Sequence, residues 1–81
     1  MSFEEAYKET CKYAKFEEDA EIGKVVDIGN SWVFILKRNH VDYGGTALEV
    51  KKETGKGYLF TLSDEDNQNK IRNGIIVPLP Q

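Results

Sequence analysis

The chain has 81 residues, of which 40% are hydrophobic and 31% are charged. A domain of this size buries only about 60% of the surface that its unfolded chain exposes, so the sequence predicts a single small domain with little room for an elaborate active site. Its 11 Lys and Arg residues against 14 Asp and Glu residues give a net charge of −3. Nucleic-acid-binding domains normally have a basic surplus, so this charge argues against a nucleic-acid partner.

The composition excludes several further classes. A single cysteine, Cys11, cannot form an internal disulfide, and together with the single histidine, His40, it leaves too few ligands for a structural zinc site. The N-terminal residues show neither the basic nor the apolar region of a signal peptide, and no apolar run approaches the roughly 18 residues of a membrane span. We therefore expect one soluble cytoplasmic domain, residues 1–81, with no membrane partner, no metal and no cofactor.

The N-terminal segment has the pattern of a helix. Ser2 and Glu5 form an S-x-x-E capping box, which satisfies free N–H groups of the first turn. Apolar side chains recur at helical spacing on one stripe, which contains Phe3, Tyr7, Cys11 and Ala14. We expect this helix to end near Phe16, because the acidic segment 17–19 would oppose the negative end of its dipole.

From Ile22 onward, the apolar residues follow the period of strands. Ile22, Val26 and Ile28 predict one face of a first strand. The dipeptide Gly29-Asn30 suits the tight turn of a hairpin. The run 32–36 is apolar at every position, which predicts a central strand that is covered on both sides.

Two more strands follow in the second half of the chain. Leu48 and Val50 alternate with charged residues, so this strand is expected to have one face in water. A turn at 53–56 then leads to its hairpin partner, residues 58–62.

A short second helix and a last strand complete the chain. Ser63 is expected to cap the helix, and Gly74 to end it in the left-handed conformation. Residues 75–77 form the last strand. The order of elements predicts an α+β fold, in which an N-terminal helix packs on an antiparallel sheet of about four to five strands, a short second helix precedes the last strand, and both helices share one face.

Few residues suggest catalysis. Cys11 would act as a nucleophile only with a base such as His40 beside it, and its place on the apolar stripe favours core packing. The acidic clusters 17–19 and 64–66 lack the spaced ligands of a calcium loop, and helix N-terminal charge explains the second. The glycines do not form a phosphate-binding loop. We therefore predict that the protein is not an enzyme.

The negative charge is concentrated near the N-terminus. Residues 1–22 contain seven acidic and three basic side chains, a net charge of −4, and the rest of the chain is nearly neutral. An acidic surface suits a basic partner protein, because complementary fields speed encounter and reject wrong partners. Solubility alone is the alternative explanation.

The middle of the chain resembles a bacterial family. The segment Ser31-Trp32-Val33-Phe34, the glycines Gly44-Gly45 and the segment 47–55, which ends in Glu53-Thr54-Gly55, resemble the immunity protein 35 family. The start of the N-terminal helix at 4–6 fits as well. The resemblance implies a small cytosolic protein that binds and neutralises a polymorphic toxin, usually encoded beside it.

An immunity protein covers the active surface of its toxin, so it needs shape, charge and a few buried anchors. The candidate toxin-binding residues are acidic or lie on the long loop between strands: Glu17, Glu18, Asp19, Asp42 and Tyr43. We expect the partner to be a cognate toxin with a basic surface, and the protein to be a monomer or a weak dimer. The alternative is a small peptidase-inhibitory or regulatory domain, which the hairpin at 50–55 also resembles and which would bind at a sheet edge.

Overall fold

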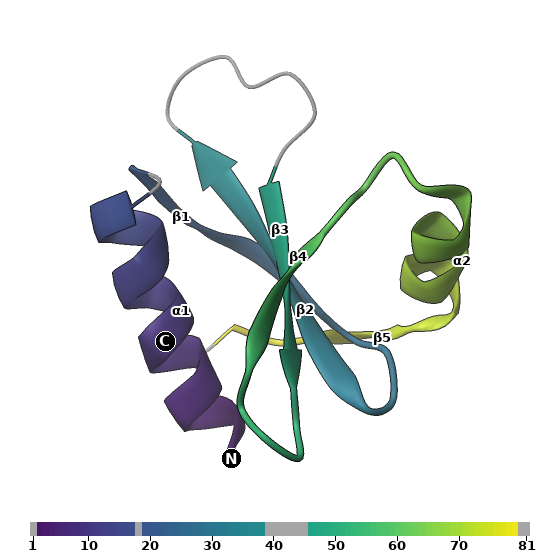
Figure 1. Ribbon diagram of the computed structural model, residues 1–81, viewed down its shortest axis with the longest axis horizontal. Helices are drawn as coiled ribbons and strands as arrows, with labels where there is room; N and C mark the ends of the chain where they lie inside the picture. Colours follow the sequence, from purple (N-terminus) through teal and green to yellow (C-terminus); the bar gives the residue numbers. More distant parts are fainter. Residues whose placement is uncertain (1, 18, 39–45, 80–81) are drawn as a thin grey trace.

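A computed structural model describes residues 2–17, 19–38 and 46–79 (Figure 1). Five strands form one antiparallel sheet in the order β4-β3-β2-β1-β5. The elements in chain order are α1 (Phe3–Glu17), β1 (Ala20–Asp27), β2 (Ser31–Arg38), β3 (Thr46–Lys51), β4 (Gly57–Phe60), α2 (Glu65–Asn73) and β5 (Ile75–Val77). The predicted α+β fold, with its short second helix before the last strand, is confirmed.

The two helices lie on opposite faces of the sheet, as Figure 1 shows, so the expectation that they share one face is wrong. α1 packs on the face that carries Phe34, whereas Ile71 of α2 packs on the face that carries Val33 and Phe60. Because the central strand β2 is apolar on both faces, each face needs its own cover. α2 supplies the second cover on the path from β4, at one edge of the sheet, to β5 at the other.

The larger core lies between α1 and the sheet. Phe3, at the start of α1, stacks on Phe34 with ring centroids 6.0 Å apart, and it meets Trp32 edge-on at 5.6 Å. Aromatic pairs in such arrangements contribute roughly 0.5–1.5 kcal/mol beyond the burial of their area. The buried members of this core are Ala6, Ala14, Ile22, Val25, Trp32, Phe34, Leu36 and Val50.

A β-bulge at Gly23 changes the faces of β1. The register of β1 against β2 shifts just after Ile22, which leaves Gly23 as an extra residue. Ile22 and Val25 therefore both face α1, while Val26 lies on the face covered by α2. The prediction that Ile22, Val26 and Ile28 share one face is wrong, because the bulge shifts the alternation by one residue.

Three glycines determine local geometry. Gly29 and Gly55 have positive φ values of 108° and 74°, which confirms the two predicted hairpin turns. Gly74 is different. It was expected to be left-handed, but its φ is −80°. It must be glycine for another reason: a Cβ at Gly74 would clash with the side chain of Val26 and lie 2.9 Å from the carbonyl oxygen of Asp27.

Polar contacts hold α2 in place, together with the partly buried Ile71. Asp64, instead of the expected Ser63, caps the helix, and its carboxylate accepts a hydrogen bond from the N–H of Asn67 at 3.2 Å. The side chains of Asn67 and Gln68 donate to the backbone carbonyls of Thr61 and Leu62. None of the nine residues of α2 is buried.

Candidate functional site

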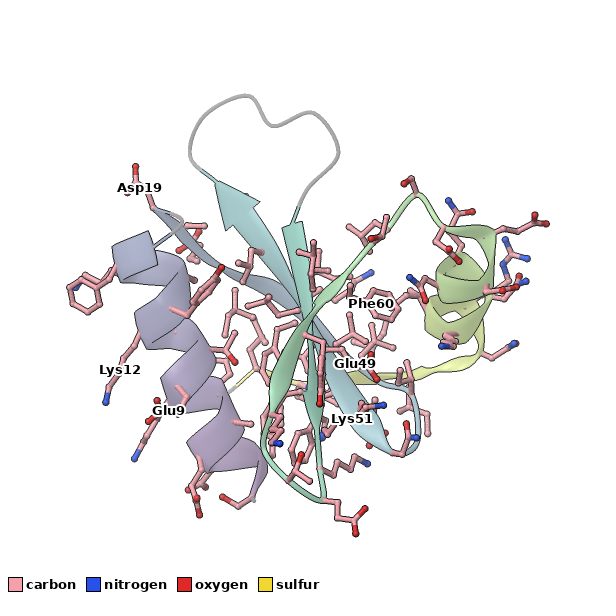
Figure 2. All side chains as sticks on the ribbon, in the orientation of Figure 1. Glu9, Lys12, Asp19, Glu49, Lys51 and Phe60 are labelled. Atoms are coloured by element: carbon pink, nitrogen blue, oxygen red, sulfur yellow. The ribbon has the colours of Figure 1, made fainter. Side chains whose placement is uncertain are left out.

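The structure describes part of the toxin-binding site that the sequence predicts. Glu18, Asp42 and Tyr43 lie outside the described residues, and Glu17 is the last residue of α1. Asp19 is exposed, has a positive φ of 48°, and lies beyond the last turn of α1 (Figure 2). Its carboxylate is therefore accessible to a partner.

The register of the sheet places Asp19 near the end of β2. Ala20, which follows Asp19, pairs with Arg38 at the end of β2, and Thr46 at the start of β3 pairs with Leu36. Arg38 and Thr46 flank the segment that contains the other two candidates. The fold thus brings Asp19, Arg38 and Thr46 to the same end of the sheet.

A small pocket lies beside Asp19, between α1 and β1, with a volume of about 470 Å³. Burial raises the pKa of the Tyr7 hydroxyl, and the Cys11 thiol and the Glu21 carboxylate raise it further. The Tyr7 hydroxyl therefore stays protonated at neutral pH. Cys11 packs against the α1 core, which confirms its interpretation as a core residue, and His40 lies outside the described residues.

A larger groove, of about 710 Å³, lies between α1 and the β3–β4 hairpin. Small and apolar residues form most of its lining, including Ala6 and Tyr13 on α1 and Leu48 and Leu59 on the strands. Among the described residues, Glu9 is the one charged side chain of the lining. The groove is an open, largely apolar concave surface, and its volume lies within the range of about 300–1,000 Å³ that is usual for binding sites.

The groove exists because α1 does not extend across the whole sheet. α1 packs mainly against β1, next to one edge, whereas β4 forms the other edge. Leu59 pairs with Leu48, which packs against the α1 core, so the pleat places both on the α1 face. Leu59 nevertheless remains 75% exposed. The sequence did not reveal this surface, because Leu59 has the alternation of an ordinary core residue.

The ion pair of Asp27 and Lys52 joins the two hairpin turns on the α1 side. Lys52 Nζ lies 2.9 and 2.8 Å from the carboxylate oxygens of Asp27, which also accepts a hydrogen bond from the N–H of Gly29. These hydrogen bonds lower the pKa of Asp27, and the bond from Lys52 has the largest effect. Lys52 Nζ also lies 5.4 Å from the ring centroid of Trp32. The Asp27–Lys52 pair is therefore explained by a structural role, the linking of the two hairpin turns.

Glu49 corrects the expectation that β3 has one face in water. Its side chain is 16% exposed, lies 3.0 Å from Lys51 Nζ, and points like Phe60 toward the side of α2 (Figure 2). Burial raises the pKa of Glu49, but hydrogen bonds from Ser31 and Lys51 and the charges of Lys51 and Lys70 outweigh it, so the net direction is downward. The face is half-covered because α2 lies over it.

Within residues 2–17, 19–38 and 46–79, no three His, Cys, Asp or Glu side chains are grouped closely enough to hold a metal ion. No helix in this part of the chain is long and apolar enough to cross a membrane. Comparisons of the chain with protein-family models, with curated proteins and with solved structures gave no significant match. The surfaces of the chain itself therefore carry the functional inference.

Proposed function

We propose that the chain is a small immunity-type protein, which binds a cognate toxin and neutralises it by covering its active surface. The observation that carries the proposal is the groove between α1 and the β3–β4 hairpin, a large apolar concavity for a domain of 81 residues. A protein that acts by covering another needs a rigid scaffold, apolar anchors and complementary charge. The resemblance of residues 31–55 to the immunity protein 35 family points to the same class.

The distribution of charge supports a basic partner. Asp19, between α1 and β1, and Glu21, at the start of β1, are exposed and belong to residues 1–22, which have a net charge of −4. Charges at the rim of an interface act mainly on the association rate and on its salt dependence. Asp19→Lys together with Glu21→Lys should therefore slow association with the toxin and weaken its salt dependence, while the melting temperature stays nearly unchanged.

Co-expression tests the proposal directly. The product of each gene adjacent to that of this chain is expressed in a heterologous bacterium, alone and together with the chain. We expect one product to stop growth, the chain to restore growth, and the purified pair to coelute in size-exclusion chromatography. The proposal is wrong if neither product stops growth, or if growth stays arrested in the presence of the chain.

A peptidase-inhibitory or regulatory domain is the second candidate. The observation that favours it is the position of β4, an edge strand that borders the groove, because domains of this kind bind peptides at a sheet edge. The two candidates differ in the partner. In the second case, an adjacent gene product is a peptidase whose cleavage of a casein substrate falls when the purified chain is added, without any arrest of growth.

A further inference from the structure

The two edges of the sheet differ in how open they are to another strand. β5 has three residues and is followed by Pro78, and natural proteins use both short edge strands and proline to prevent pairing. β4 has four residues and is followed by Thr61, which leaves its backbone without this protection. The β4 edge is thus the more accessible of the two.

The hydrogen bonds of the β3–β4 hairpin indicate which backbone groups face this edge. The N–H of Lys51 donates to the carbonyl of Lys56 at 2.9 Å, and the register continues regularly from this pair. Hydrogen-bonded and non-hydrogen-bonded pairs alternate along an antiparallel ladder. Tyr58 is therefore bonded to β3, while the N–H and C=O groups of Gly57 and Leu59 point away from the sheet.

The groove lies against the same edge. Gly57 and Leu59 line it from β4, and Tyr13 lines it from α1. An extended segment that pairs with the outward groups of β4 would direct every second side chain toward the α1 face, beside the 75% exposed Leu59. The open edge and the groove thus favour one kind of occupant, an extended chain with apolar residues at alternate positions.

Glu9 indicates the charge of that occupant. It is the one charged side chain that the described part of the chain contributes to the lining. Its ion pair with Lys12 is long, at 3.9 Å, with both side chains mostly exposed. Such a surface pair contributes little to stability. A Lys or Arg of the occupant could therefore pair with Glu9 without displacing a strong interaction.

We infer that β4 accepts an extended segment of a partner protein as an additional strand, with apolar side chains at alternate positions in the groove and a Lys or Arg near Glu9. Main-chain hydrogen bonds to Gly57 and Leu59 supply affinity, and the groove supplies specificity. The inference deepens the proposed function and rests on it for the identity of the partner, which is the toxin.

A library of short random peptides displayed on phage tests the inference without the toxin. We expect selection against the immobilised chain to enrich peptides with alternating apolar residues and one Lys or Arg. Leu59→Lys should weaken binding of a synthetic peptide from this set at least about tenfold, the effect of losing a central apolar anchor. Ile75→Lys is the matched control, because Ile75 is 72% exposed on the other edge strand, and it should leave binding unchanged.

Amide hydrogen exchange measured by NMR supplies a backbone signature. Addition of the synthetic peptide should slow exchange at Gly57 and Leu59, whereas Tyr58, already bonded to β3, should change little. Three results would overturn the inference: no peptide is enriched, binding is equal in Leu59→Lys and Ile75→Lys, or exchange at Gly57 and Leu59 stays fast in the complex.

These experiments separate the inference from the proposed function. If Leu59→Lys neutralises the toxin as well as the unaltered chain does, the proposed function stands and strand addition at β4 is wrong. If peptides bind as described but no adjacent gene product stops growth, strand addition stands and the immunity function is wrong.

Discussion

The two helices of this fold are held in place by different interactions. α1 contributes Ala6 and Ala14 to a core that includes Phe34. α2 has no fully buried residue: Ile71 packs partly buried against the smaller core, and two side-chain hydrogen bonds link the helix to the segment before it. Apolar burial contributes about 25 cal/mol per Å², and it acts across the whole length of α1. A helix cap contributes about 1 kcal/mol. The α1 face is thus the thermodynamic core, and α2 is the part of the fold expected to open first.

This difference bears on binding, because the groove lies along the better-packed helix. A surface whose side chains are already ordered loses less conformational entropy when a partner binds. α1 and the β3–β4 hairpin are suited to serve as a preformed surface, while α2 covers the opposite face. The predictions below test whether the two helices differ as strongly in their contribution to stability as they do in packing.

Phe34→Ala should have the largest effect. Phe34 is fully buried beneath Phe3, and Phe→Ala changes in cores cost about 3–5 kcal/mol in the free energy of unfolding. Urea denaturation followed by circular dichroism measures the loss. If the alanine variant is already unfolded without urea, the milder Phe34→Leu, which removes less volume, should still show a measurable unfolding transition. Phe16→Ala is the control, since Phe16 is exposed, and a similar loss in both alanine variants would contradict this description of the core.

Gly74→Ala should rank second. The added Cβ clashes with Val26 and crowds the backbone at Asp27, so α2 and β5 must shift, and overpacking of this kind costs about 1–3 kcal/mol. Gly57→Ala is the matched control, because the nearest atom to its Cβ would be the carbonyl oxygen of Glu49 at 4.0 Å. Thermal unfolding should show a lower melting temperature for Gly74→Ala alone. Equal melting temperatures would mean that α2 adjusts to the added methyl group at no cost.

Asp64→Ala should have a smaller effect that is confined to α2. Loss of the cap leaves the N–H of Asn67 without its acceptor and costs about 1 kcal/mol. Amide exchange should become faster along α2 and remain unchanged along α1. Faster exchange in both helices would show that they unfold together, contrary to the contrast drawn above.

Local signals allowed most of the fold to be predicted from the sequence. Half of the predicted capping box is present: the N–H of Glu5 donates to Ser2 Oγ at 3.2 Å, while the Glu5 carboxylate accepts from the Ser2 hydroxyl. The turn glycines Gly29 and Gly55 have the positive φ that hairpins require. The bulge at Gly23 was missed, because it is defined by pairing with a strand elsewhere in the chain. The error about the helix faces has a similar origin. The apolar run 32–36 did indicate cover on both sides, but only the path of the chain assigns α2 to the second face.

The candidate site was less predictable than the fold. Charge pointed to the segment that follows α1, where Asp19 is exposed, and its role in partner binding stays a prediction. The groove beside Leu59 gave no signal, because it depends on how far α1 covers the sheet and not on the pattern of any one segment. Glu49 was expected in water because the alternation within β3 does not show what covers its second face. Its burial depends on α2, which lies some twenty residues further along the chain.

The smallest expected effects concern pH, and they compare the two faces through one carboxylate on each. Asp27, near the α1 core, and Glu49, beneath α2, both have lowered pKa values in the folded protein. A carboxylate with a lowered folded pKa stabilises the fold above its unfolded pKa, near 4, and this contribution is lost as the pH falls through the folded value. Asp27→Asn and Glu49→Gln should therefore each reduce the decline in stability between neutral pH and acid.

Urea denaturation at a series of pH values measures these slopes. Asp27 is held by Lys52 through both carboxylate oxygens, within a link between two turns of the better-packed face, whereas the cover over Glu49 is the loosely held α2. We expect the Asp27→Asn change to persist in the Asp64→Ala background and the Glu49→Gln change to shrink there, because opening of α2 exposes Glu49 to water. If both changes persist equally, α2 protects Glu49 even without its cap, and the two helices differ less in stability than their packing indicates.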